Sequence, residues 1–93
     1  MDDSYTEYIE RYPNNTIRLR VLRNQFRNTA IIYTYYYSGE LKSEYQLLGS
    51  QFHGECFIYS ESGRVKKYYL FDRGTILRYM KFWFFLKTTK AEY

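Results

Sequence analysis

The sequence predicts an all-β protein: an antiparallel meander of about six strands, built from three β-hairpin repeats and preceded by a short N-terminal helix. Aromatic residues, which favour strands, make up 23% of the chain as 13 Tyr, 7 Phe and 1 Trp. Apolar and polar residues alternate in short runs, with turn residues about every 8–12 positions, as in all-β proteins. A short sequence frame also recurs at an offset of 24 residues, which indicates a repeat.

Length and composition exclude several classes of protein. A chain of 93 residues allows one domain, residues 1–93. The aromatic content argues against disorder, and the lone Cys56 argues against a disulfide-stapled scaffold. No window approaches the roughly 20 apolar residues of a membrane span, and the N-terminus lacks the pattern of a signal peptide. We therefore expect a cytoplasmic protein with no transmembrane segment.

The net charge of +4 is unevenly distributed along the chain. Residues 1–10 hold four acidic side chains and no base, whereas residues 11–27 hold five arginines and no acid. The acidic segment could pair with the arginines, and such pairing would lower the positive field available to a polyanion. The basic balance is therefore weak support for a nucleic-acid partner.

Residues 1–14 are predicted to form the helix, which would cap the sheet. Ser4 and Glu7 have the spacing of a capping box, and the residue before Pro13 is biased away from helix. A helical stripe at i, i+3, i+4 and i+7 comprises Tyr5, Tyr8, Ile9 and Tyr12.

Strands are predicted from the alternation of side chains over residues 17–22, 30–37, 41–47, 55–59, 65–71 and 75–86. Residues 15–86 divide into three hairpins, and residues 87–93 form a polar tail. Turns are marked by the glycines that we expect to have structural roles, Gly39, Gly54, Gly63 and Gly74. In the repeat, Val21, Tyr45 and Tyr69 fall into one column on one face of the sheet.

The repeat is most evident in the frame Ser-Gly-x-(Leu/Val)-Lys, which begins at Ser38 and again at Ser62. The same offset backwards reaches Asn15, and Asn is the other residue that tolerates left-handed backbone geometry. These segments resemble the MORN-repeat family in its shorter variant. The motif is matched by Tyr36-Tyr37-Ser38-Gly39-Glu40-Leu41-Lys42, by Tyr59 with Gly63, Val65 and Lys66, and by Phe52-His53-Gly54-Glu55.

The resemblance covers residues 36–75 well and residues 12–35 weakly, because the first unit lacks the glycines. It implies a non-catalytic repeat module for protein–protein interaction or assembly. Some bacterial relatives of this variant carry an antitoxin label, related arrays occur in large DNA viruses, and MORN-like proteins have been associated with membranes. An antitoxin-like inhibitor is therefore a further alternative.

Catalysis is not expected. His53 and Cys56 are the only His and Cys, and in a strand an odd spacing would point them to opposite faces rather than into contact. One His and one Cys do not make a zinc site, and the glycines are isolated rather than clustered in a phosphate-binding loop. We expect no metal, no cofactor and no catalytic residue.

The C-terminal aromatic run is the strongest candidate for protein binding: Phe82, Trp83, Phe84 and Phe85. A terminal strand lies at a sheet edge, and a long apolar edge invites pairing. Either the N-terminal helix covers this run, or a protein partner or a second copy of the chain does.

Candidate anion-binding residues are Arg18, Arg20, Lys42 and Lys66. With nearby tyrosines they could bind single-stranded nucleic acid, and Arg18, Lys42 and Lys66 could contact anionic lipid headgroups. The alternative is that these charges are the solvated face of the strands. Both ligands are less favoured than a protein partner.

Overall fold

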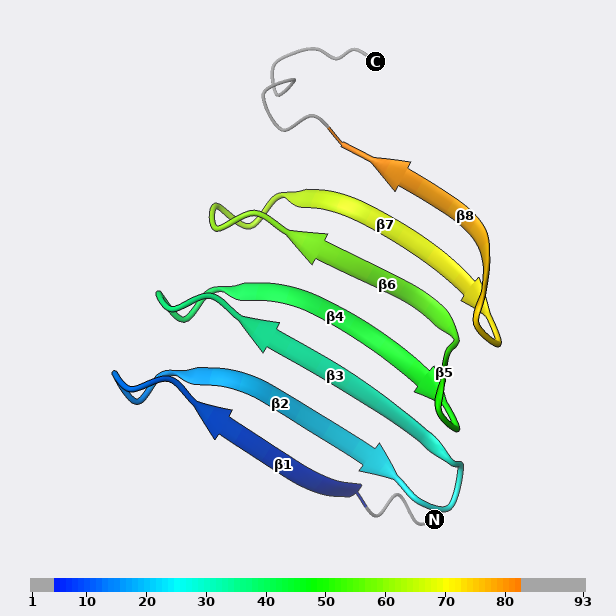
Figure 1. Ribbon diagram of the computed structural model, residues 1–93, viewed down its shortest axis with the longest axis horizontal. Helices are drawn as coiled ribbons and strands as arrows, with labels where there is room; N and C mark the ends of the chain where they lie inside the picture. The colour runs from blue at the N-terminus through cyan, green and yellow to red at the C-terminus, as the bar shows by residue number, and fades with distance from the viewer. Residues whose placement is uncertain (1–4, 83–93) are drawn as a thin grey trace.

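The computed structural model describes residues 5–82, which form one antiparallel sheet in a single layer (Figure 1). Its strands are β1 (Tyr5–Arg11), β2 (Ile17–Asn24), β3 (Thr29–Tyr35), β4 (Leu41–Leu48), β5 (Gln51–Phe52), β6 (Gly54–Tyr59), β7 (Val65–Asp72) and β8 (Thr75–Lys81). The spatial order is β1-β2-β3-β4-β6-β7-β8, and the two-residue β5 pairs with the end of β4. The predicted all-β antiparallel meander is thus confirmed, with β1 and β8 as its two edges.

The predicted N-terminal helix is wrong. Residues 5–11 form β1, which pairs with β2 from Tyr5 opposite Asn24 to Arg11 opposite Ile17. Aromatic, threonine and isoleucine residues favour this extended pairing, and a short helix would be marginal without a packing partner. The spacing of the tyrosines matches a helix, but a short segment this rich in apolar residues can match both the helical and the strand period. Ser4, the proposed cap, lies outside the described residues.

The other predicted strands are present, although the described part of the sheet has eight strands rather than six. β8 ends at Lys81, so the part of the predicted last strand beyond Phe82 lies outside the described residues. Gly39 and Gly63 occupy turns with φ of 99° and 91°, and Asn15 takes a φ of 73° at the same place in the first turn. Asn therefore replaces glycine where the backbone is left-handed.

A 24-residue repeat is visible in the strand registers. The β1–β2, β3–β4 and β6–β7 pairs each contain a register shift, after Glu10, Thr34 and Ile58. In each pair the unmatched residue on the second strand is basic: Arg18, Lys42 or Lys66. A bulge of one residue sharpens the local twist of a strand pair. The three hairpins therefore carry the same distortion at the same place.

Tyrosine hydroxyls join successive hairpins. Tyr12 donates a 2.6 Å hydrogen bond to the carbonyl oxygen of Tyr35, and Tyr36 donates one of the same length to the carbonyl oxygen of Tyr59. The two donors are 24 residues apart, as are the two acceptors. Each bond ties the turn of one hairpin to the end of a strand in the next one.

Little of this sheet is fully buried. Among the described residues only Ala30 and Cys56 are buried hydrophobic side chains, and Asn24 and Ser43 are buried polar ones. A single layer cannot enclose aliphatic side chains, whereas a broad tyrosine ring can cover the sheet and keep its hydroxyl in water. The abundance of tyrosine follows from this architecture.

Candidate interaction surface

One face of the sheet carries an uncharged row of side chains that crosses all seven strands of the main path. Directly paired residues of an antiparallel sheet share a face, so the row can be followed through the strand registers. The β4–β6 register, with Glu44 opposite Phe57, places Tyr45 level with Cys56. The complete uncharged row is Tyr8, Val21, Ile32, Tyr45, Cys56, Tyr69 and Tyr79.

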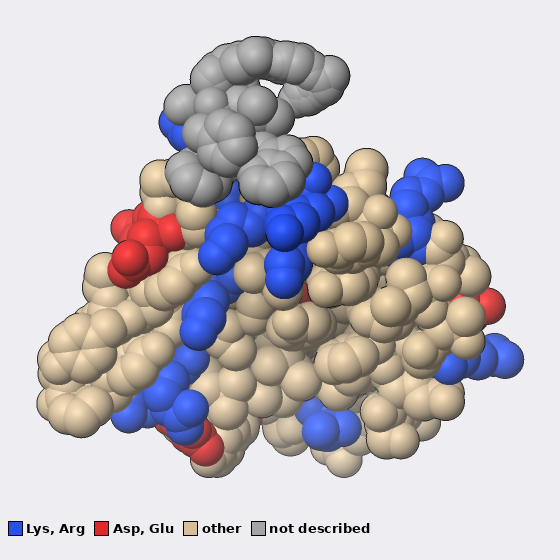
Figure 2. Space-filling view, turned by 45° about the horizontal axis from the view of Figure 1, so that its top comes forward, with Lys and Arg blue, Asp and Glu red and all other residues tan. Residues whose placement is uncertain are grey.

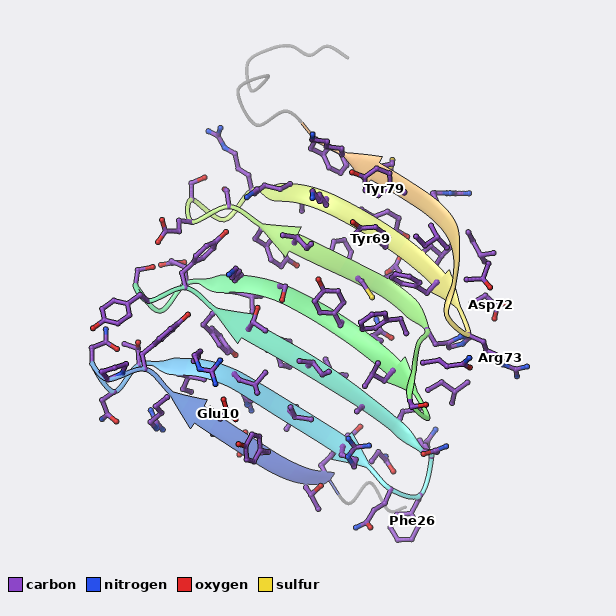
Figure 3. All side chains as sticks on the ribbon, viewed as in Figure 1. Glu10, Phe26, Tyr69, Asp72, Arg73 and Tyr79 are labelled. Carbon is purple, nitrogen blue, oxygen red and sulfur yellow. The ribbon has the colours of Figure 1, made fainter. Side chains whose placement is uncertain are left out.

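Five aromatic rings gather at the β4–β8 end of this face, and we call them the aromatic cluster. Ring centroids lie 5.0 Å apart for Tyr69 and Tyr79, 5.5 Å for Tyr69 and Phe71, and 5.2 Å for Phe52 and Phe71. Tyr45 stacks on Phe52 at 5.1 Å. Figure 3 shows Tyr69 and Tyr79 beside each other on β7 and β8. Such contacts stabilise the face and leave an apolar surface of fixed shape.

Small side chains lie between the large ones on the same face. Ala30, Ser43 and Cys56 are all buried, and Cys56 is 0% exposed. Burial raises the pKa of the Cys56 thiol, and burial also raises the pKa of the Tyr45 hydroxyl. The centre of this face is therefore poorly hydrated even in the single chain.

The opposite face carries charged groups that are already neutralised or hydrogen-bonded. Arg20 Nε donates a 2.6 Å hydrogen bond to Glu7, which raises the pKa of the guanidinium. The hydroxyl of Tyr59 donates to Glu44 at 3.0 Å, and that of Tyr68 donates to Glu55 at 2.9 Å. Several charged and polar groups of this face are thus paired within the chain, whereas the uncharged row offers rings and aliphatic groups.

Two of the four candidate anion-binding residues are engaged by acids. Arg18 forms an ion pair with Glu10, and Arg20 binds Glu7 and lies over the ring of Tyr33. Lys42 lies 5.5 Å from the ring centroid of Tyr36. Within residues 5–82, Lys42 and Lys66 make no ion pair. Figure 2 shows Lys and Arg side chains in a band across one face, with acidic side chains close to it.

A hollow of about 410 Å³ lies between the second and third hairpin turns, lined by Tyr36, Ser60, Glu61, Ser62 and Lys66. Between the first two turns, the rings of Tyr12 and Tyr37 are in contact at 5.1 Å. At the next repeat the equivalent positions are Tyr36 and Glu61, so a carboxylate side chain replaces one of the two rings. The loss of this ring contributes to the hollow.

The C-terminal candidates are only partly within the described residues. Phe82 is 43% exposed, and its backbone N–H donates to the carbonyl oxygen of Lys66 at 2.8 Å. All seven residues of β8 are exposed, and within residues 5–82 no strand pairs with its outer edge. Trp83, Phe84 and Phe85 lie outside the described residues.

His53 and Cys56 occupy different settings. His53 Nδ1 accepts a hydrogen bond from the backbone N–H of Arg73 at 3.1 Å and lies 3.6 Å from Asp72 Oδ1, whereas Cys56 is buried in the uncharged row. Residues 5–82 hold no group of three or more His, Cys, Asp or Glu side chains placed to share a metal ion. The same residues include no helix that could cross a membrane.

Comparison with protein-family models, with curated proteins and with solved structures finds no match to this chain.

The uncharged row was only partly foreseen from the sequence. Its column of Val21, Tyr45 and Tyr69 follows from the 24-residue offset. The cross-strand neighbours Ile32, Cys56 and Tyr79 require the pairing registers, which the bulges shift. Alternating apolar residues in the strands indicate which side chains share a face. They do not indicate where the bulges lie, and the bulges decide which residues of neighbouring strands are paired.

Proposed function

We propose that the protein is a non-catalytic, MORN-like repeat module that binds a protein partner through its uncharged row and aromatic cluster. The observation that carries the proposal is the contrast between the faces of one sheet. Seven neighbouring strands of the sheet present a row of uncharged side chains, and no second layer covers this row within residues 5–82. A sheet with one apolar face ordinarily buries that face against another layer.

Protein is the favoured partner because the surface is aromatic and aliphatic. Aromatic residues are enriched at the centres of protein interfaces, where charged residues are depleted. A polyanion would instead require available cations. Two of the four candidates, Arg18 and Arg20, are occupied by Glu10 and Glu7. An antitoxin would be one form of the same function, because such an inhibitor acts by binding a protein.

The non-catalytic assignment is supported by the two side chains that could serve a nucleophilic mechanism. The Cys56 thiol is buried with its pKa raised, and the thiolate is the reactive form. His53 Nδ1 accepts a hydrogen bond from the backbone N–H of Arg73, which leaves that nitrogen occupied.

Affinity capture with a matched pair of variants tests the proposal. Tyr79 and Met80 are neighbours on β8 with similar exposure, 47% and 43%, but they lie on opposite faces. We expect the immobilised chain to retain a specific protein from the cells that produce it, and Tyr79→Ser to lose it. Met80→Ser should retain it. Equal retention by both variants would exclude the uncharged row as the binding surface.

A further inference from the structure

We propose that the occupant of the uncharged row is a second copy of this chain. Two sheets would pack face to face about a two-fold axis that runs parallel to the strands and passes through β4. This inference rests on the proposed function, because it assigns the partner for the same surface. Two-fold packing is the commonest closed arrangement of identical chains, and it requires a surface that complements itself.

The area of the face suits a stable dimer. Seven strands at the usual spacing span about 34 Å, and about six residues along each strand span about 20 Å. Each copy would therefore contribute about 700 Å², or about 1,400 Å² in total. Specific protein interfaces of standard size bury about 1,200–2,000 Å² in total. The sheet is thus large enough without a further element.

The pattern of large and small side chains fits this axis. Rotation about this two-fold axis places β3 over β6 of the second copy, and β2 over β7 of the second copy. Ile32 would then face the small, buried Cys56 of the second copy, and Tyr69 would face Val21 of the second copy. At these two positions a large side chain meets a smaller one, whereas Tyr45 meets Tyr45 of the second copy on the axis and Tyr8 meets Tyr79 of the second copy, so large–small contacts alternate with contacts between rings.

Three charged side chains of this face also suit the axis, and a fourth, Arg23, lies exposed in the marginal row at the other end of the strands. Glu10, Lys67 and Lys81 share one marginal row of the face, Glu10 on β1 and the lysines on β7 and β8. The axis places β1 over β8 of the second copy, so Glu10 approaches Lys81 of the second copy. An axis perpendicular to the strands would instead place β1 over β1. The positions of Glu10 and Lys81 therefore favour the parallel axis, in which Lys81 of the second copy would approach the ion pair of Glu10 with Arg18.

Sedimentation equilibrium of the full chain, from micromolar to millimolar concentration, tests the proposal. We expect a reversible dimer of twice the 11.5 kDa chain mass. Ile31 and Ile32 are adjacent on β3, both half-buried, and point to opposite faces. Ile32→Lys should raise the dimer dissociation constant about tenfold or more, because it buries a charge in the interface. Ile31→Lys should leave the constant within about twofold.

The orientation has its own test. Lys81→Glu should weaken the dimer at low salt, and adding Glu10→Lys in the same chain should restore it. Arg78→Glu, on the opposite face of β8, is the matched control and should have little effect. Far-UV circular dichroism and thermal unfolding of each variant establish that the sheet is intact.

Two results would overturn the inference. One is a wild-type chain that stays monomeric over the whole concentration range. The other is a dimer that Ile31→Lys weakens as much as Ile32→Lys does. Neither decides the proposed function, because a monomer that captures a protein through Tyr79 would still use this face. Failure of the capture experiment, in contrast, would remove the binding surface itself.

Discussion

The hydroxyl of Tyr36 donates a 2.6 Å hydrogen bond to the carbonyl oxygen of Tyr59, and this bond joins the second hairpin to the third. Tyr12 and Tyr35 make the equivalent contact between the first and second hairpins. In a single-layer sheet each hairpin depends on its neighbours, so such contacts between repeats contribute directly to stability.

Removing the Tyr36 hydroxyl tests this role. We expect Tyr36→Phe to lower the free energy of unfolding by about 0.5–1.5 kcal/mol, because the carbonyl of Tyr59 loses its donor. Urea unfolding provides the measurement. Tyr37→Phe is the control, since Tyr37 is 55% exposed and contacts Tyr12 through its ring. Equal losses in the two variants would contradict the assigned role.

The turn before β6 requires glycine at position 54, and the second prediction tests this requirement. Gly54 has a φ of 96°, and an added Cβ would lie 2.8 Å from Gln46 Oε1. The Gln46 amide is held by a 3.1 Å hydrogen bond to the Glu55 carbonyl, which would have to break. Gly39 has a similar φ of 99° but open space around it.

We therefore expect Gly39→Ala to lower the unfolding free energy by about 1–2 kcal/mol from backbone strain alone. Gly54→Ala should lower it by about 0.5–1.5 kcal/mol more, because the Gln46 bond is also lost. Thermal unfolding of both variants provides the comparison. If Gly54→Ala were the milder change, the contact with Gln46 would not limit this turn.

Alkaline pH provides a third prediction. Burial, reinforced by the hydrogen bond to Glu44, raises the pKa of Tyr59 from 10.0 to about 12. A raised pKa favours the protonated form in the folded state, so this contribution to stability is complete below pH 10 and is lost as the pH rises towards 12. Unfolding free energies measured across this range should fall, and Tyr59→Phe should flatten the decline. Parallel curves for the two proteins would contradict this assignment.

Oligonucleotide binding separates the proposed function from its polyanion alternative. We expect fluorescence anisotropy to detect no binding of a single-stranded oligonucleotide at low salt, because Glu10 and Glu7 occupy Arg18 and Arg20. Binding with a steep dependence on salt, reduced when Lys42 and Lys66 are changed to Ala, would instead support the alternative. Vesicles containing anionic lipid provide the corresponding test for a membrane surface.

The all-β class could be predicted because alternation and turn residues are local properties of the chain. The turns at Gly39, Gly63 and Gly74 are examples, and all three glycines have positive φ. The helix over residues 1–14 failed because Tyr5–Arg11 is decided by its pairing with β2, which is a tertiary contact. The periodicity of a short segment contains no information about pairing with another strand, so it cannot show that a strand is more stable there than a helix.

The candidate site required more than the repeat. The offset of 24 residues aligns equivalent strands, such as β2, β4 and β7, but the surface also contains residues from the intervening strands. Cys56 and Tyr79 join the row only through registers that the bulges at Lys66 and Leu77 displace. The sequence therefore identified the column of Val21, Tyr45 and Tyr69, whereas the continuous surface became visible only in the assembled sheet.

The face that carries the uncharged row, rather than the opposite face, is the proposed interaction surface. Hydroxyl-radical footprinting of the associated chain tests it most directly, because Tyr68 and Tyr69 are neighbours on opposite faces of β7, as are Tyr79 and Met80 on β8. We predict that oxidation of Tyr69 and Tyr79 falls on association while oxidation of Tyr68 and Met80 stays unchanged. Protection of Tyr68 and Met80 instead would contradict the claim.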